Sequence, residues 1–190
     1  MEDNPRGCNA SADGVQFGIM IASEDPIRHF LLLQVRRFVE RAVQIPGIER
    51  IALVGSLTTE KPDPKDADVL VTVRDDADLA SLAAEGRRLK GRTQTRNKTA
   101  DIFLCDPSGI YIGRTCHWRD CRPGVRMACD ALHCGRRHYL HDDLRCVTLS
   151  TALVTKPPLV LWPRVIRNAA LPADLERILI PRENRFPSHA

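Results

Sequence analysis

Two stretches decide the fold of this chain: Ile51-Ala52-Leu53-Val54-Gly55-Ser56 and, after a nine-residue spacer, Asp66-Ala67-Asp68-Val69-Leu70-Val71-Thr72-Val73. The first is a short apolar run that ends at a glycine, which is typical of a buried strand followed by a turn. The second is rich in β-branched residues, which predicts another strand. Side chains alternate between the two faces of a strand, so Asp66 and Asp68 project to one side and the valines project to the other, into a core.

The flanking sequence predicts helices and a further strand. Asp25-Pro26 is expected to start a helix, with aspartate as the N-cap and proline at the first helical position, and Pro46-Gly47 to end it. Arg28 is expected on the polar side of this helix. A second helix is expected over 76–90 and a third strand over 100–105. Helices alternating with strands indicate an α/β fold.

The composition is that of an ordinary globular protein. Of the 190 residues, 43% are hydrophobic and 27% are charged, which excludes a disordered or collagen-like chain. The net charge of +4 favours no particular partner. We expect an N-terminal arm (1–24), an α/β core (25–113) and an irregular C-terminal extension rich in Cys and His (114–190), with one strand at 146–149 and a short helix at about 172–179.

No feature of the chain predicts secretion or membrane insertion. The first residues are acidic where a secretory signal is basic, and the apolar run over 15–22 is much shorter than the roughly 20 residues that span a bilayer. The seven cysteines cannot all be paired in disulfides within one chain. We therefore expect a cytoplasmic protein that does not contact a membrane.

The acidic residues predict a site for a divalent cation. Two carboxylates as close as Asp66 and Asp68 repel one another unless a proton or a cation lies between them. Mg²⁺ suits them because it prefers oxygen ligands and leaves positions for phosphate and water. Asp101, on the expected third strand, would add an oxygen ligand if that strand pairs beside the second. Gly55 and Ser56 supply a close backbone approach and donors for phosphate oxygens.

The order of these parts resembles the minimal nucleotidyltransferases of the DNA-polymerase-β superfamily. The pattern of that superfamily is a hydrophobic residue, Gly and Gly or Ser, a spacer of about nine to thirteen residues, Asp-hydrophobic-Asp/Glu-hydrophobic, and a later Asp on a strand. The resemblance covers about residues 27–106. Lys65 is one departure, since a hydrophobic residue often precedes the first aspartate.

This resemblance implies a nucleotidyltransferase-like mixed sheet flanked by helices. It implies that Gly55 and Ser56 hold the triphosphate, that Asp66 and Asp68 ligate Mg²⁺, and that Asp101 completes the catalytic carboxylates. The implied reaction is transfer of a nucleoside monophosphate from an NTP, with ATP as the expected donor, to a hydroxyl of a small molecule, a protein or an RNA. Asp106 competes for the role of third carboxylate, although its place beside Pro107 favours a turn.

The extension carries a second candidate metal site. Cys116, Cys121, Cys129 and Cys134 form two C-x4-C pairs seven residues apart, a spacing compatible with a structural Zn²⁺ site. The alternative is that these cysteines are small buried hydrophobic residues. The competing function is accordingly a non-catalytic nucleotidyltransferase-like module whose zinc-bearing extension binds nucleic acid or a protein partner.

Two further features have weaker functional interpretations. A basic cluster is expected to be a solvated turn over 87–98, although it could contact nucleic acid through phosphates; its members are Arg87, Arg88, Lys90, Arg92, Arg96 and Lys98. Cys and His are plentiful enough for a thiol-nucleophile enzyme, but no single cysteine is distinguished. The sequence has no Walker phosphate loop, and Gly109-Ile110-Tyr111-Ile112-Gly113 is not a dinucleotide-binding motif.

Overall fold

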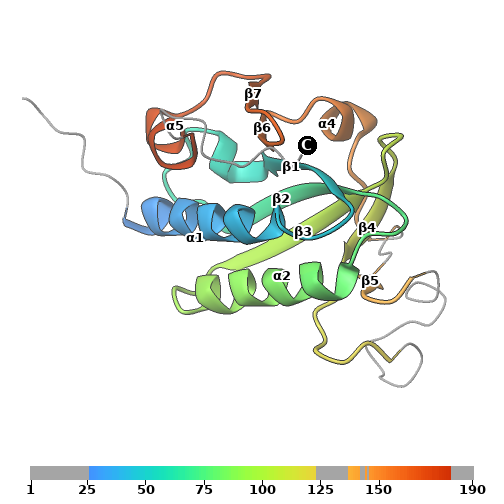
Figure 1. Cartoon of the computed structure of the whole chain (residues 1–190). Helices are drawn as coiled ribbons and strands as arrows, with labels where there is room; N and C mark the ends of the chain where they lie inside the picture. Colours follow the sequence, from blue (N-terminus) through green and yellow to red (C-terminus); the bar gives the residue numbers. More distant parts are fainter. Residues whose placement is uncertain (1–25, 123–136, 142–143, 145, 181–190) are drawn as a thin grey trace, which may run out of the picture.

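A computed structural model describes residues 26–122, 137–141, 144 and 146–180. The strands in this part of the chain form one mixed sheet, in the order β5-β4-β3-β2-β1-β6-β7 (Figure 1). β2 and β3 pair in parallel, and the other neighbouring strands pair antiparallel. The strands are β1 (Ile48–Val54), β2 (Asp66–Val73), β3 (Thr99–Cys105), β4 (Tyr111–Thr115), β5 (Leu140–His141), β6 (Leu159–Trp162) and β7 (Ile166–Arg167).

Helices cover both faces of the sheet. α1 (Pro26–Ala42) and α2 (Leu79–Gln94) lie side by side on one face, and α4 (Thr151–Thr155) lies on the other (Figure 1). α5 (Ala173–Leu179) packs its apolar residues into the same core as α1. The core under α1 and α2 takes every second residue of β2 and β3, and a smaller apolar cluster lies beneath α4. The expected α/β architecture, a sheet flanked by helices, is confirmed.

Several predicted elements occur close to where the sequence placed them. The strand at 66–73 has the expected bounds, and the third strand begins one residue early, at Thr99. α1 begins at Pro26 as predicted. β1 begins at Ile48, before the apolar run at 51–54, because Ile48 and Arg50 extend the pairing with β2, with an irregularity in the register between them.

The prediction of the second helix was wrong at both ends. The helix begins at Leu79, because Asp78 is the N-cap and its side chain accepts a hydrogen bond from the Ser81 amide. It continues to Gln94, so most of the expected basic turn is helical. Arg, Lys and Leu are good helix formers, and Leu89 and Thr93 keep a buried side facing the sheet.

The C-terminal region is more regular than predicted. No strand forms at 146–149, but β6 pairs with β1, and α5 begins one residue after Pro172. The region 114–190 therefore contributes strands to the common sheet and a helix to the main core. Within the described residues, no helix combines the length and the apolar character needed to cross a bilayer.

Candidate acidic site on the sheet

The three candidate carboxylates lie on one face of the sheet. In the parallel pair of β2 and β3, Asp68 is directly opposite Asp101, and Asp66 is opposite Thr99. Paired residues share a face, and Asp66 lies two residues from Asp68, so all three acids project to the same side. The alternate residues Ala67 and Ala100 are buried in the main core on the other side. The common face predicted for Asp66 and Asp68 is confirmed, and Asp101 shares it because β3 pairs beside β2.

Gly55 closes one side of this group of acids. It follows β1, whose last residue, Val54, is paired with Asp68. Gly55 has φ +73°, and a Cβ atom at this position would lie 2.3 Å from Oδ2 of Asp68. Any other residue would be strained in this conformation and would also collide with the carboxylate. Ser56 follows in the 3-10 helix η1 (Gly55–Thr58), where it is half-buried.

The electrostatics of Asp68 indicate a crowded negative site. Its pKa is raised to about 7, chiefly because burial disfavours the charged carboxylate and further because Asp66 and Asp101 are negatively charged. The positive charge of Arg114 opposes these effects. A carboxylate that holds a proton near neutral pH among other acids is a position where a cation would be favoured.

Two of the acids are engaged with neighbouring side chains. Asp66 Oδ1 accepts a hydrogen bond from Thr99 Oγ1 at 2.6 Å. Asp101 Oδ1 forms an ion pair with Arg114 Nη1 at 3.2 Å, and both side chains are 21% exposed. Among the described residues, no three His, Cys, Asp or Glu side chains are gathered closely enough to hold an ion. The donor set fits a hard cation, and binding one would require these carboxylates to turn toward Asp68.

Arg114 was missed by the sequence prediction. It lies on β4, opposite Phe103 of β3, and therefore on the same face as Asp101. A sequence signal for it exists, because Asp106-Pro107-Ser108-Gly109 is a typical turn between two strands of a hairpin. Alternation along the second strand of that hairpin would have placed Arg114 beside the acids.

Arg28 is also a correction, because the sequence placed it on the solvent side of α1. It is buried, with 6% exposure, and its Nε atom forms an ion pair with Asp174 Oδ2 of α5 at 2.6 Å. One Nη group donates to the carbonyl oxygen of Leu57 at 2.8 Å. Arg28 thus ties α1 and α5 to the turn that contains Ser56, so it helps to position this turn.

Comparison with protein families places the chain in one group. Residues 12–121 match the family described as a family of unknown function, DUF6932. The match covers more than half of the chain and includes Gly55, the three acids and Arg114. The chain belongs to the DUF6932 family. No curated protein and no solved structure matches it.

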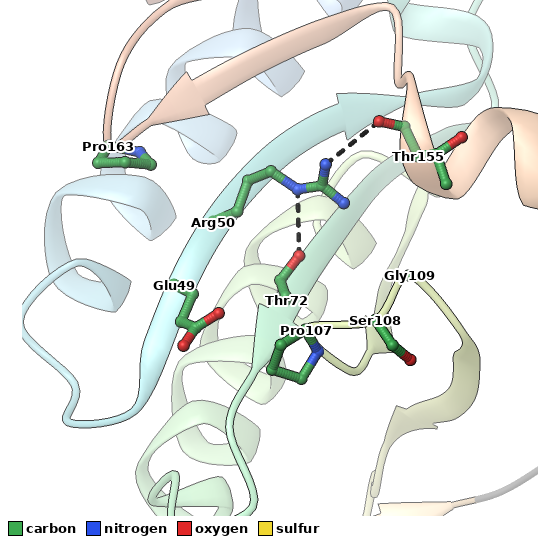
Figure 2. Close-up of a pocket in the computed structure, with 8 residues that line it drawn as sticks. All are labelled: Glu49, Arg50, Thr72, Pro107, Ser108, Gly109, Thr155 and Pro163. Atoms are coloured by element: carbon green, nitrogen blue, oxygen red, sulfur yellow. Dashed lines mark hydrogen bonds between the residues drawn. The ribbon is translucent and has the colours of Figure 1, made fainter.

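A pocket in this DUF6932 protein lies away from the acids. It has a volume of about 340 Å³ and lies at the other end of β1 and β2, where Arg50 and Thr72 form part of its wall (Figure 2). Arg50 donates from Nε to Thr72 Oγ1 at 3.1 Å and from Nη2 to the carbonyl of Val154 at 2.7 Å. A weaker contact of 3.4 Å reaches the carbonyl of Thr155. Arg50 therefore satisfies the carboxyl end of α4, which is a structural role.

The predicted zinc ligands are only partly within the described residues. Cys129 and Cys134 lie outside them. Cys116 is buried just after β4, and the Cys121 sulfur accepts a hydrogen bond from the Tyr139 amide at 3.1 Å. The zinc site stays a prediction.

The remaining candidates have local structural roles. The Asp106 carboxylate accepts hydrogen bonds from Ser108 Oγ and the Ile110 amide, which confirms it as a turn residue. In the basic cluster, Lys98 forms an ion pair with Asp63 at 2.5 Å, and the Arg96 guanidinium lies over the ring of Phe30. These contacts give at least part of the cluster a structural function.

Proposed function

We propose that this DUF6932 chain is a metal-dependent nucleotidyltransferase that transfers a nucleoside monophosphate from an NTP to a hydroxyl acceptor. ATP is the expected donor. The observation that carries the proposal is the direct pairing of Asp68 with Asp101 on a face shared with Asp66. The backbone of Gly55 closely approaches the Asp68 carboxylate at this point. The resemblance described above assigns the same residues to this chemistry.

Each residue has a defined role in the proposed reaction. Asp66, Asp68 and Asp101 would hold Mg²⁺, and Gly55 and Ser56 would bind the triphosphate. A bound metal ion would neutralise phosphate charge and lower the pKa of the attacking hydroxyl. Asp101 would orient that hydroxyl and accept its proton as the oxygen attacks. A bond forms between the acceptor oxygen and the α-phosphorus, the bond from the α-phosphorus to the bridging oxygen breaks, and pyrophosphate leaves with that electron pair.

Calorimetric titration with ATP and Mg²⁺ tests the proposal. We expect binding that requires Mg²⁺ and is lost in the double variant Asp66→Asn/Asp68→Asn. The matched control is Asp75→Asn, because Asp75 is an exposed aspartate just beyond the other end of β2. This control should bind like the wild type. Metal-independent binding, or none, would instead favour the non-catalytic module.

The acceptor is a separate question that a labelling experiment addresses. The protein is incubated with labelled NTPs and a cell extract, and the species that gains label is identified. Label on a small molecule, a protein or an RNA names the acceptor class. The Asp101→Asn variant should transfer at least about 100-fold less label, because it lacks the carboxylate next to the reacting oxygen. Equal transfer by this variant would exclude Asp101 from catalysis.

A further inference from the structure

The ion pair between Arg114 and Asp101 places a positive charge where a metal ligand is expected. Arg114 Nη1 lies 3.2 Å from Asp101 Oδ1, and the two side chains are equally half-buried. The positive charge of the guanidinium also stabilises the charged form of Asp68 and so opposes the rise in the pKa of that carboxylate. Arg114 thus affects the charge balance of both Asp68 and Asp101.

A guanidinium and a divalent cation make the same demand on Asp101. Both need a carboxylate oxygen with its lone pairs directed at them. Turning Oδ1 of Asp101 toward a cation shared with Asp68 would lengthen its ion pair with Arg114, and the two positive charges would repel one another across the shared carboxylate, so metal binding favours opening of the ion pair. Arg114 lies on β4, the strand next to Asp101, so after opening it would remain on the same face of the sheet.

We propose that Arg114 is a placeholder cation, which holds Asp101 while metal is absent and pairs with the phosphates of the nucleotide once metal takes Asp101. This inference rests on the proposed function and adds to it an order of events. Metal binding and nucleotide binding are coupled through one side chain, because the ion that displaces Arg114 also makes its charge available to the polyphosphate.

The proposal predicts effects of opposite sign for two ligands. In Arg114→Gln, Mn²⁺ alone should bind about five-fold more tightly, since a half-buried ion pair of roughly 1 kcal/mol no longer competes. ATP at saturating Mn²⁺ should bind about ten-fold more weakly, because a charge-assisted contact with phosphate is lost. A merely structural role of Arg114 would weaken both.

Electron paramagnetic resonance measures free Mn²⁺, and calorimetry measures ATP binding, each on the full chain. Arg36→Gln is the control, because Arg36 forms an exposed ion pair with Glu40 within α1; it should change neither affinity. Arg114→Lys keeps the charge but loses the planar fork, so we expect a smaller change of the same signs. It carries the test if the glutamine variant does not fold.

The outcomes separate this inference from the proposed function. If the wild type binds Mn²⁺ and the Arg114 variants bind it no more tightly, the placeholder role is overturned and the nucleotidyltransferase proposal survives. Tighter Mn²⁺ binding with unchanged ATP binding also overturns it, because the second contact is then absent. If neither the wild type nor the variants bind Mn²⁺, both proposals are overturned.

Discussion

Charged side chains at the two ends of one sheet face have opposite surroundings. At one end, Arg50 is surrounded by neutral acceptors, the hydroxyl of Thr72 and the carbonyls that end α4. At the other end, Asp68 lies on the same face as two more carboxylates, whose charges raise its pKa, and Arg114 opposes this effect and forms an ion pair with Asp101. The two groups are only a few residues apart along β2.

This difference separates a charge that stabilises the fold from charges that destabilise it. Arg50 satisfies backbone oxygens that would otherwise lose their hydrogen bonds, so its charge stabilises the fold. The acids repel one another, and burial adds to the unfavourable energy of their charged forms. An arrangement that destabilises the folded protein is more typical of a functional site than of a structural one.

The largest effect expected concerns the pH dependence of stability at the acidic end. The pKa of Asp68 is about 7 in the folded protein and near its ordinary value of 3.8 in the unfolded chain. Between these values the folded protein holds a proton that the unfolded chain has released, so stability falls as the pH rises through this window. The loss is up to about 4 kcal/mol.

Asp68→Asn removes the ionisation and should remove this loss. Urea unfolding in metal-free buffer at pH 5 and pH 8 measures it. The variant should gain stability over the wild type at pH 8 and gain much less at pH 5. If the stability of the two proteins depended on pH in the same way, the charge of Asp68 would not destabilise the fold. The two ends of the sheet face would then not differ in the way described above.

The second-largest effect is expected from adding a methyl group at Gly55, which borders the acids. Gly55→Ala combines a left-handed backbone conformation with a Cβ position 2.3 Å from the Asp68 carboxylate. We expect a loss of about 3 kcal/mol in unfolding free energy and loss of Mn²⁺ binding. Gly91→Ala is the control, since a Cβ there meets nothing within 4 Å on α2; it should stabilise by about 0.5–1 kcal/mol. Gly55→Ala with unchanged Mn²⁺ affinity would separate Gly55 from the site.

The smallest effect is expected at the Arg50 end. Arg50→Met keeps the length of the side chain but leaves the Val154 carbonyl without its donor, which should cost about 2 kcal/mol of unfolding free energy. Mn²⁺ affinity should not change, because the acids lie at the other end of the strands. Arg36→Met, at an exposed pair, should lose no more than about 0.5 kcal/mol. A change in Mn²⁺ affinity in Arg50→Met would mean that the two ends are coupled.

The sequence predicted the local parts of this site better than their pairing. Alternation along 66–73 placed Asp66 and Asp68 on one face, because that property depends only on the strand itself. The direct pairing of Asp68 with Asp101 depends on how the parallel crossover over residues 74–98 closes, which no local pattern determines. Arg28 was misassigned because its burial depends on α5, which is distant in sequence.

The direction of β2 and β3 determines which segments border the acids. The acids lie near the N-terminal ends of both strands. The segments that border the site are therefore those that precede the strands, residues 59–65 and 95–98, and the chain leaves at the opposite end of each strand. In doubly wound sheets, by contrast, ligands meet the loops that follow the strands. The ion pair between Lys98 and Asp63 links these two segments. Changes in the length or charge of these segments would alter access to the carboxylates while leaving the hydrophobic core intact, so the surroundings of the acids can vary without loss of the fold.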